Sequence, residues 1–209
     1  VDEDIGRIID LLKELDIDEN TFVLLTSDNG PHYEGGHKPA VFNSNGPLKG
    51  HKRDFTEGGI RVPLIIKWPS VVKPGTTSDE PVTSVDYFPT IAEATGLVLP
   101  EGRDIDGLSL VKHLSSQGTQ KLGRDAIFWH FPHYRHNPGP YSIIRQGGWK
   151  LIKFYEGPME LFDLNNDLGE TKNLASVMPE KVKELENRLL AHLKSVGAKM
   201  PIPNPAAKN

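Results

Sequence analysis

Two neighbouring oxygen-bearing side chains, Asp28 and Asn29, directly follow an apolar run and could bind a hard cation. The run 21–26 predicts a buried strand, and in open α/β sheets ligands gather at the carboxyl ends of strands. A carboxylate beside an amide carbonyl suits Ca²⁺ or Mg²⁺ better than zinc or copper. Asp-Asn-Gly is also typical of a simple turn. Two side chains cannot fill a calcium shell of about 6–8 oxygens, so further ligands must come from elsewhere.

A lysine in a glycine-rich stretch, Lys52, is the second group that could do chemistry. It lies five residues before Glu57 and the glycine pair that follows it. Glycines allow the backbone to approach a ligand closely, and an ammonium group can bind a tetrahedral oxyanion as a point charge. Spacing alone does not separate Lys52 from Lys49 or Arg53, and a solvated surface cation is the plain alternative.

Six of the eight histidines fall into two groups. The groups are His32, His37 and His51, and His130, His133 and His136. None has the spacing of a zinc-binding helix. The second group is interleaved with aromatic residues over 128–136, which suits the binding of a sugar or an aryl group. An ordinary strand edge with packed aromatic rings is the alternative.

Composition excludes some functions and weakens others. The chain has 209 residues, a net charge of −4 without blocks of like charge, and no cysteine. This balance argues against nucleic acid or an anionic membrane as the main partner, and no apolar run reaches the roughly 18 residues of a membrane span. Without cysteine there is no disulfide from which to infer a compartment. The missing Gly-x-Ser-x-Gly, P-loop and dinucleotide motifs weaken the serine esterase, NTPase and dehydrogenase interpretations.

The first part of the chain predicts helices around buried strands. Apolar residues at helical spacing predict a helix over about 3–15, so that Val1 lies at or inside the start of a helix and the chain is expected to be a piece of a longer protein. Strands are predicted at 21–26 and 62–68, apolar on both faces as in a parallel sheet covered by helices. Helices are expected at 84–95, with Ser84 as N-cap and Gly96 as the stop, and at 107–115. The irregular stretch 28–60 between the strands is long enough to suggest a functional loop.

The second part of the chain predicts a small antiparallel sheet. Short β-rich runs at 126–131, 141–145, 149–155 and 159–164 are separated by turn residues. A final amphipathic helix is marked by Val182, Leu185, Leu189, Leu193 and Val196, with Pro179 placed for its first turn. The fold class is therefore α/β: part of a mainly parallel, helix-covered sheet over residues 1–123, followed by an antiparallel sheet with a C-terminal helix over 124–209.

A series of short stretches, taken in order, resembles the C-terminal half of a type I sulfatase of the alkaline phosphatase superfamily. The stretches are Val1-Asp2-Glu3-Asp4-Ile5-Gly6-Arg7, Leu24-Leu25-Thr26-Ser27-Asp28-Asn29-Gly30-Pro31, Lys52-(x4)-Glu57-Gly58-Gly59-Ile60-Arg61-Val62-Pro63, Lys67-Trp68-Pro69, Asp86-Tyr87-Phe88-Pro89-Thr90-Ile91, Gly148-Trp149-Lys150-Leu151-Ile152, and Leu161-Phe162-Asp163-Leu164 with Asp167, Glu170 and Asn173-Leu174-Ala175. They cover nearly the full length of the chain.

The resemblance implies roles for the candidate residues. Asp28 and Asn29 match a pair of metal ligands, with Ca²⁺ expected rather than Mg²⁺, and Lys52 matches the lysine that contacts the sulfate group. Glu57 and Arg61 are expected to hold the loop.

The histidines would help to set specificity. His130 and His133, and also His32, are expected near the leaving group of the substrate. The resemblance implies a sulfuric ester hydrolase, and the mixture of imidazoles and aromatic rings favours a sulfated carbohydrate over an aryl sulfate ester.

The expected nucleophile is absent from the chain. In the family it is a formylglycine made from the cysteine of a Cys-x-Pro-x-Arg motif, and this chain has no cysteine. The chain alone is therefore expected to be inactive, with the formylglycine in an N-terminal half that completes the site. A phosphate or phosphonate monoester hydrolase and a non-catalytic glycan-binding fragment remain alternatives. The resemblance also implies a secreted, periplasmic or lysosomal location.

Overall fold

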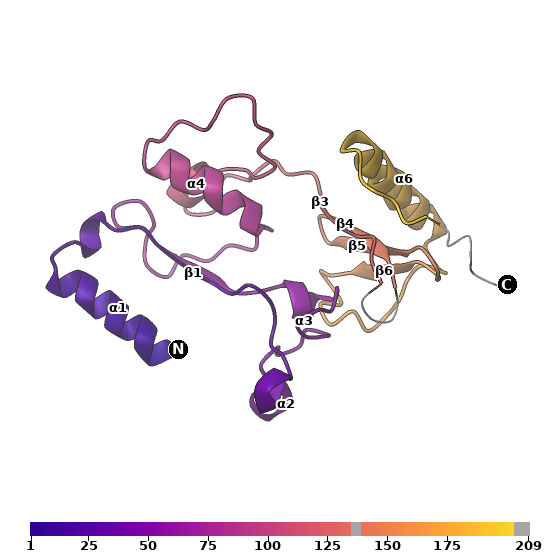
Figure 1. The fold of residues 1–209 in the computed structure, drawn as a ribbon, viewed down its shortest axis with the longest axis horizontal. Coiled ribbons are helices and arrows are strands. Elements are labelled where there is room, and N and C mark those ends of the chain that lie inside the picture. Colours follow the sequence, from indigo (N-terminus) through magenta and orange to yellow (C-terminus); the bar gives the residue numbers. More distant parts are fainter. Residues whose placement is uncertain (135–138, 203–209) are drawn as a thin grey trace. The chain divides into compact units, whose positions relative to one another are not determined.

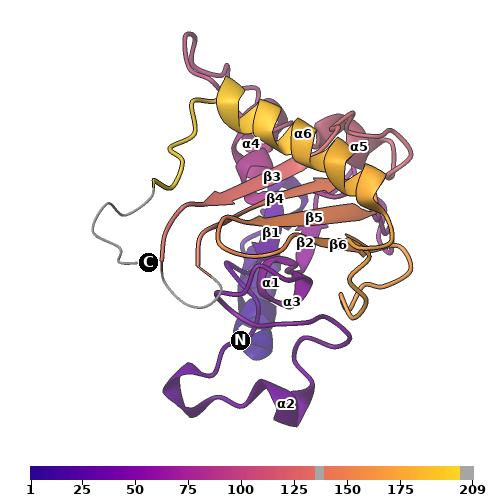
Figure 2. The ribbon, with the colours of Figure 1, turned by 90° about the vertical axis from the view of Figure 1, so that its right-hand side faces the viewer.

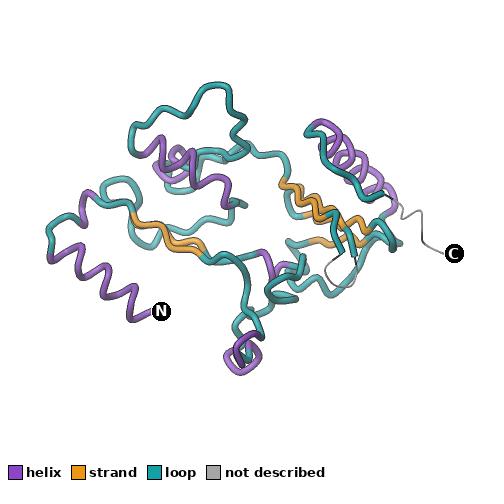
Figure 3. Tube along the Cα trace, in the orientation of Figure 1, coloured by secondary structure: helices purple, strands orange, loops and turns teal. Residues whose placement is uncertain are grey.

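A computed structural model describes residues 1–134 and 139–202 (Figure 1). The chain divides into two compact units, one made of residues 1–27 and 63–124 and the other of residues 28–62 and 125–209. Helices alternate with strands and long loops along the chain (Figure 3), and the predicted α/β class is confirmed. The division into domains at residue 123 remains a prediction. In the structure, the loop 28–62 groups with the C-terminal unit.

Among its described residues, the first unit contains three α-helices and two strands that form a two-stranded sheet. Its α-helices and strands are α1 (Asp2–Glu14), β1 (Val23–Thr26), β2 (Leu64–Lys67), α4 (Tyr87–Ala94) and α5 (Val111–Ser115). Short 3-10 helices lie at Asp18–Asn20 and Ser84–Asp86. The predicted first helix and both predicted strands are confirmed, although each strand is shorter than its apolar run.

The two strands differ from expectation in direction. β1 and β2 pair antiparallel, with Val23 opposite Lys67 and Thr26 opposite Leu64. The sequence suggested a mainly parallel sheet because both runs are apolar on both faces. That pattern indicates that both faces of a strand are buried, and it does not indicate whether neighbouring strands run parallel or antiparallel. The direction is set by the intervening loop, which contains no long crossover helix.

The helical segment predicted over 84–95 begins on a different cap from the one predicted. Thr83, rather than Ser84, is the N-cap: its hydroxyl accepts a hydrogen bond from the amide of Val85, and Asp86 accepts one from the amide of Thr83. Asp86 is fully buried and also bonds the side chain of Arg124. Because the amide of Leu108 donates to Asp86 at 2.8 Å, the chain there is not helical, and α5 begins at Val111 instead of residue 107.

The second unit is an antiparallel sheet with a helix across it, as predicted. Its strands are β3 (Ile127–Phe131), β4 (Tyr141–Gln146), β5 (Trp149–Phe154) and β6 (Glu160–Asp163), in that order across the sheet. Helix α6 (Pro179–Ser195) crosses one face of this sheet (Figure 2). Its buried residues recur three or four apart and pack on apolar residues of the strands. These are Val182, Leu185, Leu189 and Leu193, against Ile144, Leu151 and Leu161.

The loop 28–62 contains short helical turns within its irregular path. They are the 3-10 helix Glu34–Gly36 and the α-helical turns α2 (Pro39–Phe42) and α3 (Glu57–Ile60). None is long enough to show helical periodicity, which explains why the sequence predicted only a loop.

A fully buried lysine fixes this loop to the sheet. The Nζ atom of Lys150, on β5, lies 3.0 Å from Oε1 of Glu57 in α3 and 2.8 Å from Oε1 of Glu170 in the loop after β6. The amide of Glu57 donates to Oε2 of Glu170 at 2.7 Å. The guanidinium of Arg145 lies 3.7 Å from Glu57 and offsets the second negative charge. Three segments far apart in sequence thus meet at one buried ion cluster.

Replacing Lys150 by methionine should destabilise the protein strongly. The variant leaves Glu57 and Glu170 buried without their shared cation, and breaking a buried ion pair costs about 3–5 kcal/mol. Urea unfolding of wild type and variant measures the loss. Lys153→Met, on the same strand but paired with Glu186 at a partly exposed position, is the matched control and should cost no more than about 1 kcal/mol. Equal losses in the two variants would contradict the assigned role.

The loop that carries Glu170 should weaken in acid. Hydrogen bonds from the backbone of Lys172 and Thr171 lower the pKa of Asp167 below its ordinary value. A lowered pKa stabilises the fold above the unfolded pKa of 3.8, and the contribution is lost as the pH falls through the lowered value.

Asp167→Asn should therefore reduce the midpoint of thermal unfolding at neutral pH, and the difference from wild type should shrink in acid. Melting curves at a series of pH values test this, with Asp104→Asn in an exposed loop as the control. A difference that is independent of pH would count against the hydrogen-bond explanation.

Candidate active site

Two backbone hydrogen bonds bring the predicted metal and anion-binding residues into one loop assembly. The amide of Gly30 donates to the carbonyl of Gly59 at 3.0 Å, and the amide of Lys52 donates to the carbonyl of Pro31 at 2.8 Å. The segment after Asp28 therefore lies directly against the segment that contains Lys52 and α3. The sequence placed these groups 24 residues apart, and the loop pairing is what joins them.

Glycines make this pairing possible. A Cβ atom on Gly30 would lie 1.8 Å from the carbonyl oxygen of Gly58, and one on Gly58 would lie 2.3 Å from the carbonyl oxygen of Gly50. A Cβ atom on Gly59 would likewise lie 2.2 Å from the carbonyl oxygen of Asp54. The sequence suggested that glycines here admit a ligand. In the structure they allow the neighbouring backbone to approach instead, and this backbone leaves no space for a side chain at the three glycine positions.

The two candidate metal ligands have suitable donor chemistry. Asp28 is exposed, and Asn29 is half-buried with its amide nitrogen donating to the carbonyl of Gly30 at 2.9 Å. Because the nitrogen is directed to the backbone, the oxygen of the amide is the atom suited to ligate a cation. Both donors are oxygens and fit a hard divalent ion. No cluster of three or more His, Cys, Asp or Glu side chains suited to a metal occurs among the described residues, so these two would form part of a larger ligand set.

The structure distinguishes Lys52 from Lys49. The Nζ atom of Lys49 lies 3.3 Å from the carbonyl oxygen of Glu170 and 5.8 Å from the ring centre of Phe162, so this lysine is directed to the sheet and its following loop. Lys52 instead lies 3.3 Å from Oε2 of Glu34, and the neighbouring Arg53 bonds the same carboxylate. Lys52 and Arg53 therefore share one carboxylate, whereas Lys49 contacts the sheet and the loop after β6.

The early histidines lie in the same assembly. The Nδ1 atom of His32 accepts a hydrogen bond from the amide of Glu34 at 3.0 Å, and its ring lies 5.7 Å from that of His37. His51 pairs with the hydroxyl of Tyr33 at 3.0 Å. The structure thus brings His32 together with Lys52, while its predicted contact with substrate stays a prediction.

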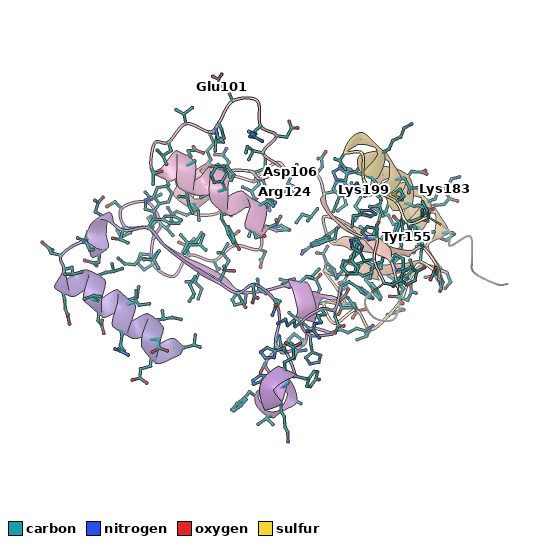
Figure 4. The ribbon with its side chains drawn as sticks, in the orientation of Figure 1. Glu101, Asp106, Arg124, Tyr155, Lys183 and Lys199 are labelled. Atoms are coloured by element: carbon teal, nitrogen blue, oxygen red, sulfur yellow. The ribbon has the colours of Figure 1, made fainter. Side chains whose placement is uncertain are left out.

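His130 lies in a hydrogen-bonded row on the C-terminal sheet. Its Nε2 atom lies 2.9 Å from the carbonyl oxygen of Lys199, which can only accept, so Nε2 carries the hydrogen. Its Nδ1 atom lies 2.7 Å from the hydroxyl of Ser142, which lies 2.7 Å from that of Tyr155. Tyr155 and Lys199, the two ends of this row, are labelled in Figure 4. Both ring nitrogens therefore have partners within the chain, and a contact between this ring and a substrate remains a prediction.

Ring contacts connect His133 to the loop assembly. His133 is exposed and meets Phe131 edge-on at 5.3 Å, Phe131 stacks on Tyr141 at 5.5 Å, and Tyr141 contacts Phe55 at 4.8 Å. Burial, the largest cause, raises the pKa of the Tyr141 hydroxyl. His136, the last member of the predicted group, lies outside the described residues.

Sequence reasoning missed two residues of the assembly. Glu34 carries no motif signal, because a glutamate beside two glycines is ordinary loop composition. Tyr141 was placed on a strand without a role in the site. Only the pairing of distant segments brings either residue to the candidate site.

No helix among residues 1–134 and 139–202 is long and apolar enough to cross a membrane.

Comparison with known proteins identifies the family. Residues 50–199 match the family described as N-sulphoglucosamine sulphohydrolase, C-terminal, and residues 1–97 match the family described as sulfatase. A sulfatase of Formosa agariphila is 33% identical over 223 residues, covering 92% of this chain and 38% of that protein.

Solved structures agree with this match. One is of a protein in complex with its substrate, D-glucosamine-2-N,6-O-disulfate, with 30% identity and a TM-score of 0.76 over 96% of this chain and 40% of that one. Another is a phosphonate monoester hydrolase of Agrobacterium radiobacter, with 27% identity and a TM-score of 0.67 over 91% of this chain and 38% of that one.

The chain belongs to the sulfatases, within the alkaline phosphatase-like superfamily, and the resemblance drawn from the sequence is confirmed. It spans about two fifths of the length of the relatives it matches. Membership of this family implies the use of a metal and a formylglycine in its chemistry.

Replacing Gly30 by alanine should separate the two loop segments. The added methyl group would collide with the carbonyl of Gly58, and overpacking of this kind costs about 1–3 kcal/mol. Chemical denaturation measures the loss. Gly6→Ala is the control, because nothing lies within 4 Å of its Cβ position on α1, where alanine should stabilise by about 1 kcal/mol. If Gly30→Ala were as stable as wild type, the close approach would be disproved.

Proposed function

We propose that the protein to which this chain belongs is a sulfuric ester hydrolase that releases sulfate from a sulfated carbohydrate. The observation that carries the proposal is the joining of Asp28 and Asn29 to Lys52 by the two hydrogen bonds between their loops. Membership of the sulfatase family supports it, and so does the structural relative described with a sulfated glucosamine as its substrate.

Each residue has a stated part in the proposed reaction. Asp28 and Asn29 contribute oxygen ligands to a divalent cation, proposed to be Ca²⁺, which would supply positive charge to the sulfate oxygens. Lys52 binds the same group and stabilises the charge that develops on it. His32 lies in the same loop assembly, and His133 is linked to it through aromatic rings. With His130 they are proposed to bind the sugar.

The nucleophile must come from other residues of the protein. The chain contains no cysteine from which a formylglycine could form. The first unit exposes apolar side chains suited to contact with further polypeptide: Ile8, Leu11 and Ile65 are 58%, 51% and 59% exposed. Among the described residues its sheet has two strands, so both outer edges lack a neighbouring strand. We propose that an N-terminal part of the same protein covers these surfaces. By family analogy we also propose a secreted, periplasmic or lysosomal location.

Two other functions compete with this proposal. A phosphonate monoester hydrolase shares the fold, and the relative from Agrobacterium radiobacter supports it. A non-catalytic glycan-binding fragment is the second, supported by the absence of a cysteine. The intact mass of the protein from its natural source distinguishes the glycan-binding fragment from a hydrolase. A mass near 23.2 kDa would mean that the protein consists of this chain, which has no nucleophile. A mass more than twice as large, with a formylglycine peptide, supports the hydrolase.

Lys52→Ala should lower the turnover of a sulfated sugar by about 10²–10³-fold, because it removes a preorganised charge from the transition state. The assay uses the full-length protein with glucosamine 6-O-sulfate and the matching 6-phosphate, each followed by release of the free anion. Lys38→Ala, an exposed lysine of the same loop, is the control and should retain activity. Faster release of phosphate than sulfate would favour the competing hydrolase, and no release of either would favour the binding module.

Removal of divalent cations should abolish turnover, and Ca²⁺ should restore it. Asp28→Asn keeps the size of the side chain and removes its charge, so the variant should need a higher Ca²⁺ concentration for the same rate. Activity after chelation, titrated with Ca²⁺ and separately with Mg²⁺, makes the measurement. Full activity in the chelated protein would reject a metal-dependent reaction.

A further inference from the structure

One carboxylate, that of Glu34, pairs with two cations of the loop assembly, Lys52 and Arg53. Oε2 of Glu34 lies 3.3 Å from Nζ of Lys52, and Oε1 of Glu34 bonds the guanidinium of Arg53. The three side chains are 32% to 45% exposed, so solvent reaches all of them. The lysine to which we assign the sulfate group thus already has an anionic partner within the chain.

Backbone hydrogen bonds fix the segments that carry the two cations. The amide of Lys52 bonds Pro31, and the turn that contains Arg53 is closed by a hydrogen bond from the amide of Asp54 to the carbonyl of His51. Glu34 precedes two glycines, Gly35 and Gly36, with φ of 67° and 80° and nothing within 4 Å of either Cβ position. The amide of Glu34 donates to Nδ1 of His32 at 3.0 Å, and its side chain is 45% exposed, so the carboxylate can leave the two cations by rotation of the side chain into solvent.

The chemistry of the pair suits exchange for another oxyanion. A lysine and an arginine that share one carboxylate are also arranged to share one sulfate group, because both anions present oxygens to the same donors. Exposed ion pairs contribute at most about 1 kcal/mol, so displacement of the carboxylate costs little. This contrasts with the buried pairs of Lys150, which solvent does not reach.

We infer that Glu34 is an internal anion that occupies Lys52 and Arg53 until the sulfate group of the substrate replaces it, which makes Arg53 a second sulfate-binding residue. The inference rests on the proposed function, since it takes Lys52 as the residue that binds the sulfate group. When the ester bond has been cleaved, the return of Glu34 competes with inorganic sulfate for both cations. Glu34 thereby weakens product inhibition.

Glu34 keeps its charge over the range in which it must compete. The hydrogen bond from Lys52 is the largest cause that lowers the pKa of Glu34, and the charges of Arg53 and His32 act in the same direction. The carboxylate is therefore anionic at neutral pH.

Sulfate affinity of four full-length proteins tests the inference. Sodium sulfate is titrated calorimetrically into wild type, Glu34→Gln, Arg53→Gln and the control Glu180→Gln, at an ionic strength held constant with sodium chloride. Glu34→Gln should bind sulfate about two- to five-fold more tightly, as expected from the loss of an exposed competing ion pair. Arg53→Gln should bind sulfate more weakly than wild type, and Glu180→Gln, on an exposed position of α6, should match wild type.

The opposite result has a distinct meaning. If Glu34 only orients Lys52, then Glu34→Gln should bind sulfate more weakly, and this outcome overturns the inference. Unchanged affinity in Glu34→Gln, or no sulfate binding by wild type and Glu34→Gln alike, also overturns it. Turnover of glucosamine 6-O-sulfate, measured on the same samples, tests the proposed sulfatase activity independently of the role of Glu34. A wild-type protein that binds sulfate and hydrolyses no sulfate ester would reject that function while leaving the binding comparison intact.

Discussion

The buried contact of Lys150 with Glu57 and Glu170 is the interaction on which the candidate site depends. Lys150 comes from the centre of the C-terminal sheet, Glu57 begins α3, and Glu170 lies in the loop after β6. An ammonium group without water must be surrounded by compensating charge, and this requirement fixes the relative positions of the three segments. Because Glu57 directly precedes Gly58 and Gly59, the cluster also fixes the backbone against which Gly30 packs.

Close backbone packing transmits that constraint to the groups proposed to do chemistry. Gly30 bonds Gly59, and the residue before Gly30 is one of the proposed metal ligands. The hydrogen bond between Pro31 and Lys52 fixes the other side of the assembly. The same sheet that anchors the loop carries His130, and His133 follows the end of β3. The C-terminal unit therefore supplies support for the loop as well as candidate residues for the substrate. A structural role for Glu57 agrees with its expected part in holding the loop.

Two kinds of ion pair serve different purposes within this one unit. The pairs of Lys150 are buried, so breaking them leaves uncompensated charge, and they are suited to fixing a position. The pairs of Glu34 with Lys52 and Arg53 are exposed to solvent, contribute little to stability, and are suited to exchange with a ligand. The difference in burial, rather than in the types of residue, separates support from recognition.

The sequence by itself determined the elements whose signals are local. Periodic apolar residues predicted α1 and α6, short β-rich runs separated by turn residues predicted β3 to β6, and the order of motifs predicted the family. Residue types also identified Asp28, Asn29 and Lys52 as candidates, because carboxylate, amide and ammonium groups have chemistry that is independent of their surroundings. The tertiary structure decided the antiparallel direction of β1 and β2, the cap at Thr83 and the different surroundings of Lys49 and Lys52. It also decided the pairing of Glu34 and the burial of Lys150. These features depend on contacts between residues distant along the chain, whose energies arise only when folding brings the segments together.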